Sequence, residues 1–221
     1  MAEKKEILKL SGINKCFGNV VVAKDIRLKV ISNQLHALIG PNGAGKTTLI
    51  KMISGELKPD QGVITFLDRK VNHLSEIARV HLGCIRSFQV SSIIGSMTVF
   101  ENILLAVKQK RSILKMLFRK FQSNSSESNF VYQTLNQLSL ETMETKVAST
   151  LSHGDKRKLE LAMALAMGPK ILLLDEPFAG LDQAESSKLI ELLKSIKKNM
   201  PILLIEHDMQ AVFALADKIS V

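Results

Sequence analysis

Hydrophobic and polar residues alternate along two stretches near the N-terminus, residues 7–13 and 20–30. Alternation with a period of two sends successive side chains to opposite faces, so we expect two half-buried strands with a hairpin-like connection at residues 15–19. A third expected strand, residues 62–68, follows the turn-forming sequence Pro59-Asp60-Gln61-Gly62. The first third of the chain is therefore predicted to be rich in strands.

Three short segments are mainly apolar: residues 35–39, 171–174 and 201–205. Such runs are typical of strands that are buried on both faces of a parallel sheet. Segments with helical spacing or helix-start signals lie between and after them. We expect helices at residues 49–53, 75–82, 98–110, 130–138, 156–167, 182–198 and 208–215. The alternation predicts an α/β fold with a parallel sheet, whose ligand lies at the carboxyl ends of the strands.

The composition of the chain changes between residues 90 and 150. Six basic residues follow one another there without an acidic residue among them: Lys108, Lys110, Arg111, Lys115, Arg119 and Lys120. A polar, Ser-rich stretch at residues 122–129 then predicts a loop. The basic run is typical of a solvated face, and it is also suited to the headgroups of a membrane surface.

Length and charge narrow the class of protein. The 221 residues can bury one core, and we expect one domain with an insertion. No apolar run approaches the roughly 20 residues of a membrane span. The net charge of +9 indicates an anionic partner, either a nucleotide, a nucleic acid or a membrane surface, or else a solvated basic face. Cys16 and Cys84 lack the spacing of a metal site, which favours a cytosolic, reduced chain.

The first candidate site is a glycine-rich loop between an apolar run and a helical segment. Its sequence is Gly40-Pro41-Asn42-Gly43-Ala44-Gly45-Lys46-Thr47-Thr48, which fits the phosphate-loop pattern G-x-x-x-x-G-K-[ST]. Glycines let successive N–H groups turn toward an anion, and the start of the helix adds its own N–H groups. We expect Lys46 to lie along the β- and γ-phosphates of a nucleotide and the Thr47 hydroxyl to hold Mg²⁺.

Carboxylates and other polar side chains follow the buried strands. Asp175 and Glu176 come directly after residues 171–174. Two adjacent carboxylates there are costly unless they face a metal or a proton-transfer site, so we assign Asp175 to Mg²⁺ and Glu176 to the general base for water. Gln89, which ends an expected strand, could reach the metal or the attacking water. His207 could donate a hydrogen bond to the γ-phosphate.

The local sequence alone leaves the roles of two further residues, Phe17 and Ser152, open. Phe17 lies at the predicted turn, where it can stack on a base, although the local pattern favours packing in the core. Ser152, with Asp155 three residues later, resembles a capping box. The start of that helix is either a plain cap or a receptor for a phosphate.

Taken together and in this order, these motifs resemble the ATPase subunits of ATP-binding-cassette (ABC) transporters over essentially the whole chain. The resemblance implies a phosphate-loop (P-loop) NTPase core of the RecA-like type, with an N-terminal antiparallel β subdomain. The core would comprise residues 1–89 and 151–221, and residues 90–150 would be an inserted helical subdomain that receives the membrane subunits. A single cassette domain would thus span residues 1–221, with ATP and Mg²⁺ as its cofactors.

The resemblance also assigns roles. It implies that Phe17 stacks on adenine, which reverses the local preference, and that Gln89 contacts the metal and water. Ser152 and Gly154 would bind the ATP of the opposite subunit, and Asp182 would belong to a loop that crosses the dimer interface. His153 and Asp155 stand where the commoner signature L-S-G-G-Q has Gly and Gln. Because Ser152 and Gly154 are kept, we do not infer inactivity.

Finer details are similar to the ATPases of branched-chain amino acid importers and their urea and amide relatives. They are the stretches Arg86–Gln89, Leu151–Asp155 and Ile205–Met209. The implied partners are a second cassette, identical or paralogous, two membrane permeases and, indirectly, an extracytoplasmic solute-binding protein. The implied location is the cytoplasmic face of the membrane, and no nucleic acid is expected. The alternatives are an ATPase for lipid or lipopolysaccharide export and a soluble cassette acting on nucleic acid or ribosomes.

The last residues, 219–221, begin another alternating stretch and then stop, where members of the family continue. We therefore expect a truncated chain. Three residues would be too few to complete a ladder, and the strand at residues 202–205 would be left as an uncovered edge.

Overall fold

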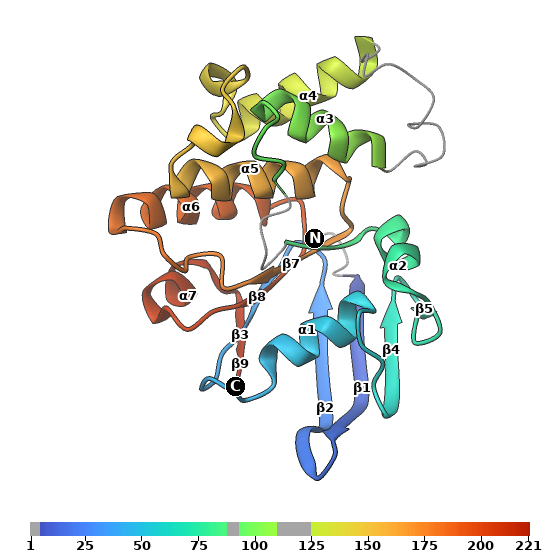
Figure 1. The fold of residues 1–221 in the computed structure, drawn as a ribbon. Coiled ribbons are helices and arrows are strands. Elements are labelled where there is room, and N and C mark those ends of the chain that lie inside the picture. The colour runs from blue at the N-terminus through green and yellow to red at the C-terminus, as the bar shows by residue number, and fades with distance from the viewer. Residues whose placement is uncertain (1–4, 88–92, 110–124) are drawn as a thin grey trace.

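The computed structural model of the chain describes residues 5–87, 93–109 and 125–221. Within them, four strands form an antiparallel sheet in the order β2-β1-β4-β5 (Figure 1). The strands are β1 (Glu6–Phe17), β2 (Val20–Ile31), β4 (Gln61–Phe66) and β5 (Arg69–Lys70). The three strands expected in this part of the chain are thus confirmed, and β1 and β2 extend right up to the turn at residues 18–19.

Five strands of the described residues form a second sheet in the order β6-β7-β8-β3-β9, and all of its neighbours are parallel. They are β3 (Leu35–Leu38), β6 (Cys84–Arg86), β7 (Ile171–Asp175), β8 (Ile202–Ile205) and β9 (Lys218–Ser220). The three apolar runs are the three central strands, because these are covered on both faces.

The prediction that residues 202–205 form an uncovered edge strand of this sheet was wrong. β8 lies between β7 and β3, and β9 forms a parallel ladder with the other side of β3. Its three residues pair with His36, Ala37 and Leu38, and the Ser220 carbonyl accepts a hydrogen bond from Ile39 N at 2.9 Å. The reason is topological: after β8 the chain passes through a helix and returns beside β3, not beside β8.

The helices mostly match their predicted positions. They are α1 (Lys46–Ser54), α2 (Glu76–Leu82), α3 (Val99–Gln109), α4 (Ser125–Gln137), α5 (His153–Ala166), α6 (Gln183–Ile196) and α7 (Met209–Leu215), with short 3-10 turns at Glu141–Met143 and Ala148–Thr150. None of the described helices is long and apolar enough to cross a membrane. The prediction of a Ser-rich loop at residues 122–129 was wrong in part, because residues 125–129 form the start of α4. Serine is well suited to the start of a helix. The basic residues from Lys110 to Lys120 lie outside the described residues.

The side chains of the parallel sheet alternate between two cores. Ile171 and Leu173 face α1, which packs between the two sheets, and Leu172 and Leu174 face the core shared with α5 and α6. Figure 1 shows α3 and α4 gathered on α5, on the far side of the parallel sheet from α1. With both faces covered, the loops after β3, β7 and β8 meet at the carboxyl edge of the sheet, where the candidate residues lie.

Candidate active site

The glycine-rich loop joins β3 to α1 and has an unusual backbone. Gly43 and Gly45 have φ angles of 81° and 85°, in the left-handed region. At Gly45 the space is also restricted, because a Cβ atom would lie 2.6 Å from the carbonyl oxygen of Val22. Only glycine fits both conditions. α1 then begins with Gly45 as its N-cap, without a side-chain cap, and its first turn, which is fully described, contains no acidic residue.

Lys46 is the first residue of α1, and its side chain folds back over the loop. It is 8% exposed, and its Nζ donates hydrogen bonds to the carbonyl oxygens of Gly40 and Pro41 at 2.7 and 2.9 Å. A cation and the open N-terminus of a helix therefore face the same loop. This combination suits a phosphate group. A cavity of about 390 Å³ borders the loop, between β2 and the end of β9.

Asp175 ends β7 beside this loop and is 4% exposed. Its Oδ2 accepts a hydrogen bond from Arg86 Nη2 at 3.0 Å, whereas its buried Oδ1 has no hydrogen-bond partner among the described residues. Burial raises the pKa of Asp175, and the neighbouring Arg86 guanidinium, with a smaller effect from the Thr47 side chain, opposes the rise. Arg86 also pairs with Glu56 at 2.8 Å.

These residues fit a magnesium ion. The orphaned carboxylate oxygen of Asp175 and the nearby Thr47 hydroxyl are the hard oxygen donors that Mg²⁺ prefers. The described residues contain no cluster of three or more His, Cys, Asp or Glu side chains that could hold a metal. Mg²⁺ usually takes one or two protein ligands and completes its shell with phosphates and water.

Glu176, the next residue, has a left-handed backbone with a φ of 50°. Its N–H donates to the Ile205 carbonyl at 2.9 Å, and its carbonyl accepts from Arg157 Nη2 at 3.5 Å. Its carboxylate Oε1 lies 3.8 Å from His207 Nδ1, so the loops after β7 and β8 bring these two predicted residues together. A non-glycine residue in this conformation costs on the order of 1 kcal/mol and is often found at functional sites.

Sequence reasoning missed Glu206, which holds these two loops together. It is 1% exposed, its Oε1 accepts from Phe178 N at 3.1 Å, and its Oε2 accepts from His207 N and Asp208 N at 2.8 and 3.1 Å. The sequence contained a signal for Glu206, because this acidic residue follows an apolar strand just as Asp175 ends one. Arg86, at the end of β6, was missed as well. Its sequence signal was a charged residue at the end of a short apolar strand.

The start of α5 forms a second group of predicted residues. Ser152 is the N-cap, and its Oγ accepts from Asp155 N at 3.1 Å. Gly154 N donates to Glu185 Oε1 of α6 at 3.0 Å. Asp182 is the N-cap of α6 and forms a full capping box with Glu185. Ser152, Gly154 and Glu185 line a small cavity of about 120 Å³, separate from the one at the phosphate loop.

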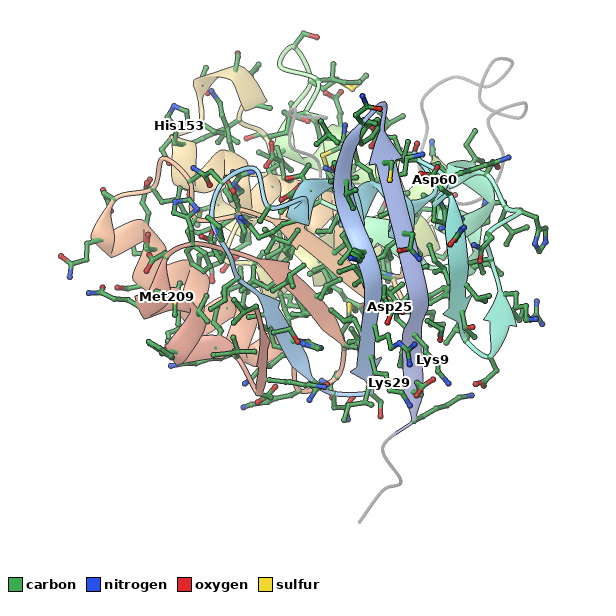
Figure 2. All side chains as sticks on the ribbon, turned by 90° about the horizontal axis from the view of Figure 1, so that it is seen from below. Lys9, Asp25, Lys29, Asp60, His153 and Met209 are labelled. Atoms are coloured by element: carbon green, nitrogen blue, oxygen red, sulfur yellow. The ribbon has the colours of Figure 1, made fainter. Side chains whose placement is uncertain are left out.

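Phe17 ends β1 at the turn and is 49% exposed, so the packing interpretation was wrong. Lys15 Nζ lies 5.4 Å from the centroid of its ring and pairs with Asp60 at 2.6 Å. Figure 2 shows His153, at the start of α5, on the opposite side of the molecule from Asp60. A single chain therefore does not bring the start of α5 to Phe17. Gln89 lies outside the described residues.

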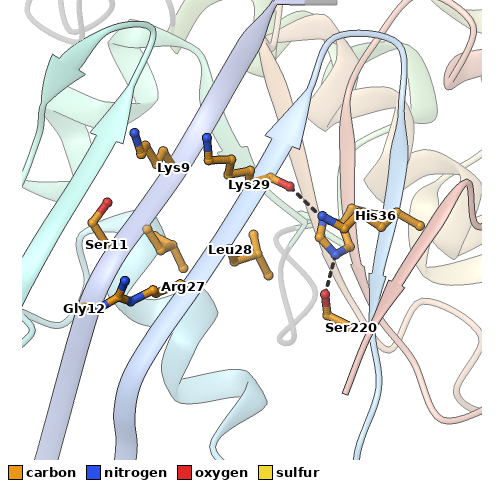
Figure 3. A pocket seen from close by; sticks show the side chains of 10 residues that line it. Lys9, Ser11, Gly12, Arg27, Leu28, Lys29, His36 and Ser220 are labelled. Atoms are coloured by element: carbon orange, nitrogen blue, oxygen red, sulfur yellow. Dashed lines mark hydrogen bonds between the residues drawn. The ribbon is translucent and has the colours of Figure 1, made fainter.

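A larger cavity, of about 620 Å³, involves none of the predicted residues (Figure 3). Its cations are Lys9, Arg27, Lys29 and Lys218. His36, which is fully buried beside it, uses its ring nitrogens to contact the Lys29 carbonyl and the Ser220 hydroxyl at 2.9 and 2.8 Å. Burial lowers the pKa of His36. The ring thus joins the two sheets.

Known proteins resemble this chain over most of its length. The model of the family described as "ABC transporter" matches residues 23–179. The high-affinity branched-chain amino acid transport ATP-binding protein LivG of Salmonella typhimurium is 36% identical, over 97% of this chain and 87% of that protein. Its counterpart BraF of Pseudomonas aeruginosa is 34% identical, over 98% of this chain and 88% of that protein.

Solved structures agree with this result. A nucleotide-free ATP-binding cassette from an ABC transporter superimposes with a TM-score of 0.86 at 28% identity, covering 97% of this chain and 86% of that one. A cassette in its ADP conformation gives the same TM-score at 30% identity, with the same coverage. The predicted α/β phosphate-loop fold is confirmed. With its family model, its relatives and its fold in agreement, the chain belongs to the ABC transporter family, as one of its ATP-binding cassettes.

Proposed function

We propose that the chain is the ATP-hydrolysing subunit of an importer for branched-chain amino acids or a related small polar solute such as urea or an amide. The observation that carries the proposal is the pair Asp175 and Glu176 at the end of β7, beside the phosphate loop and within reach of His207. The substrate class is supported by the names of LivG and BraF, which describe transport of branched-chain amino acids.

Nucleotide binding uses the open start of α1. The phosphates lie against backbone N–H groups of residues 42–48, and Lys46 Nζ exchanges the carbonyl oxygens of Gly40 and Pro41 for phosphate oxygens. The exposed ring of Phe17 stacks on the adenine. Its position is fixed by Lys15, whose ammonium lies near the ring and is held by Asp60.

Hydrolysis uses the loops after β7 and β8. Glu176 accepts the proton of the attacking water, and His207 donates a hydrogen bond to the γ-phosphate. Glu206 keeps both residues in register through its three backbone hydrogen bonds. Thr47 and Asp175 would hold Mg²⁺, with Gln89 as a further ligand from the family resemblance, and the ion would neutralise charge on the phosphates when bound.

The site is completed by a second cassette arranged head to tail. Each ATP then lies between one phosphate loop and the partner's Ser152 and Gly154, with Asp182 at the interface. The second cassette is a copy or a paralogue. The inserted region at residues 90–150 contacts two permeases at the cytoplasmic face of the membrane, and a solute-binding protein delivers the solute to them. No nucleic acid takes part.

The test is Glu176→Gln in the purified chain. Without its general base, we expect hydrolysis to fall by ~10²–10⁴-fold, while the dissociation constant for Mg-ATP stays close to that of the parent chain. Glu191→Gln on the exposed face of α6 is the matched control and should leave both quantities unchanged. Hydrolysis at the parent rate by Glu176→Gln would exclude this carboxylate as the base.

The same variant tests the substrate class in cells that lack the native chain. The parent chain should restore uptake of labelled leucine, isoleucine or urea, and Glu176→Gln should not. Labelled ribose and sulfate are the controls, because other cassettes of the family that resemble this chain are named for their import. Restored uptake of ribose or sulfate alone would overturn the substrate assignment and leave the ATPase assignment standing.

A further inference from the structure

Two carboxylates of the same chain occupy the start of α5. The Gly154 N–H donates to Glu185 Oε1 at 3.0 Å, and the Ser152 hydroxyl donates to Asp155 Oδ2 at 3.0 Å. Asp155 lies in the first turn of α5 itself, whereas Glu185 reaches across from α6. The donors that a phosphate would use at this helix terminus are therefore already bound to anions.

The approach of Glu185 is unusually close, and it depends on the glycine. A Cβ atom at position 154 would lie 2.5 Å from Glu185 Oε1, so any other residue would push the carboxylate away. Glu185 also receives the Asp182 N–H on its other oxygen, at 3.4 Å. One side chain thus joins the start of α5 to the loop that begins α6.

A carboxylate oxygen and a phosphate oxygen compete for the same N–H group. Both accept hydrogen bonds and both are negative, so they repel each other when they lie side by side. A phosphate that arrives at Gly154 must therefore displace the Glu185 carboxylate. Lys158 and Lys188 line the same small cavity, and Lys158 already lies 3.4 Å from Asp155, so displaced carboxylates have cations nearby.

We propose that Glu185 is a positioning residue that, together with Asp155, stands in for the phosphate of the partner's ATP while the cassette is unpaired. This inference rests on the proposed head-to-tail dimer. When two cassettes close, the γ-phosphate takes the Gly154 N–H, and Glu185 releases both Gly154 and Asp182. The Glu185 carboxylate thereby raises the ATP concentration required for closure of the dimer. It also links phosphate binding at the start of α5 to the loop that contains Asp182.

The experiment measures dimer formation by sedimentation equilibrium over a range of Mg-ATP concentrations. All chains carry Glu176→Gln, so that ATP persists. Glu185→Gln keeps the shape of the side chain but removes its charge. We expect the dissociation constant of the ATP-bound dimer to fall by about ten-fold, because a symmetric dimer contains two such contacts and each contributes roughly three-fold. A purely structural contact would change dimerisation in the opposite direction when weakened.

Two further variants complete the design. Glu191→Gln on the same helix removes an exposed charge and should leave dimerisation unchanged. Asp155→Asn removes the other carboxylate and should strengthen the dimer in the same direction, so it keeps the inference testable if Glu185→Gln fails to fold. If the Glu176→Gln chain alone does not dimerise with ATP, the proposed function fails. If it dimerises, and the charge-removing variants dimerise equally or more weakly, the role of Glu185 is refuted.

Discussion

The starts of α1 and α5 are both glycine-containing helix termini, and they are built in opposite ways. α1 begins at an uncapped Gly45, without an acidic residue in its described first turn, and its first side chain is the cation Lys46. α5 begins with Ser152 as a side-chain cap and receives the carboxylates of Asp155 and Glu185. One terminus is open to an anion, and the other is closed by anions of the chain itself.

The difference follows from how each terminus would meet its phosphate. A nucleotide reaches α1 from solution, so this terminus must be ready in the single chain. In the proposed dimer the phosphate for α5 arrives only on a partner, and an empty helix start leaves N–H groups without acceptors. Internal carboxylates satisfy those groups in the meantime. On the proposed head-to-tail arrangement, the same local motif is kept open or closed according to the source of its ligand.

Alanine substitutions at Gly45 and Gly154 should show the largest difference between the starts of α1 and α5. Gly45→Ala combines a left-handed backbone with a Cβ that meets the Val22 carbonyl, so we expect a loss of unfolding free energy of about 1–3 kcal/mol and weakened ATP binding. Gly154→Ala has no such backbone strain, and its Cβ meets only side-chain atoms of Glu185, which can shift more easily than backbone, so its loss of unfolding free energy should be smaller.

Urea unfolding and nucleotide titration of the two variants provide the measurement. Gly43→Ala is the control for backbone strain alone, because its φ is also left-handed but no atom lies within 4 Å of its Cβ position. Its stability should lie between that of the parent and that of Gly45→Ala. Equal losses for Gly45→Ala and Gly154→Ala would show that the two termini do not differ in this way.

A smaller effect is expected at Phe17, which tests whether the nucleotide on α1 extends to the tip of the antiparallel sheet. Phe17→Ala should raise the dissociation constant for ATP several-fold, since stacking of this kind contributes on the order of 1 kcal/mol. The melting temperature without nucleotide should hardly change, because the ring is 49% exposed. Phe17→Tyr keeps the aromatic face and should bind ATP like the parent. A large loss of stability at equal ATP affinity would contradict the stacking role.

Many of the elements that form the starts of α1 and α5, and the residues beside them, could be predicted from the sequence. The apolar runs identified β3, β7 and β8, and the phosphate-loop pattern identified the start of α1. The paired acids at the end of β7 were found because buried charges at a strand end require a reason. The helix of α5 and its cap at Ser152 were also predicted, since capping is a local property.

What could not be predicted are contacts between residues that only the fold brings together. Arg86 meets Asp175 because β6 and β7 are neighbours, and Glu185 meets Gly154 because α6 packs near the start of α5. The position of β9 beside β3 was missed for the same reason, since three residues carry too little pattern to indicate a neighbour. Strand order and helix packing are properties of the whole chain.

The central claim is that the open terminus of one chain and the closed terminus of another form one ATPase site. The most direct test measures hydrolysis per chain as a function of chain concentration at saturating Mg-ATP, with sedimentation equilibrium as the reference for dimer content. The account predicts that activity per chain rises with concentration in step with the dimer fraction and vanishes for the monomer. Constant activity per chain, down to concentrations at which only monomers are present, would contradict it.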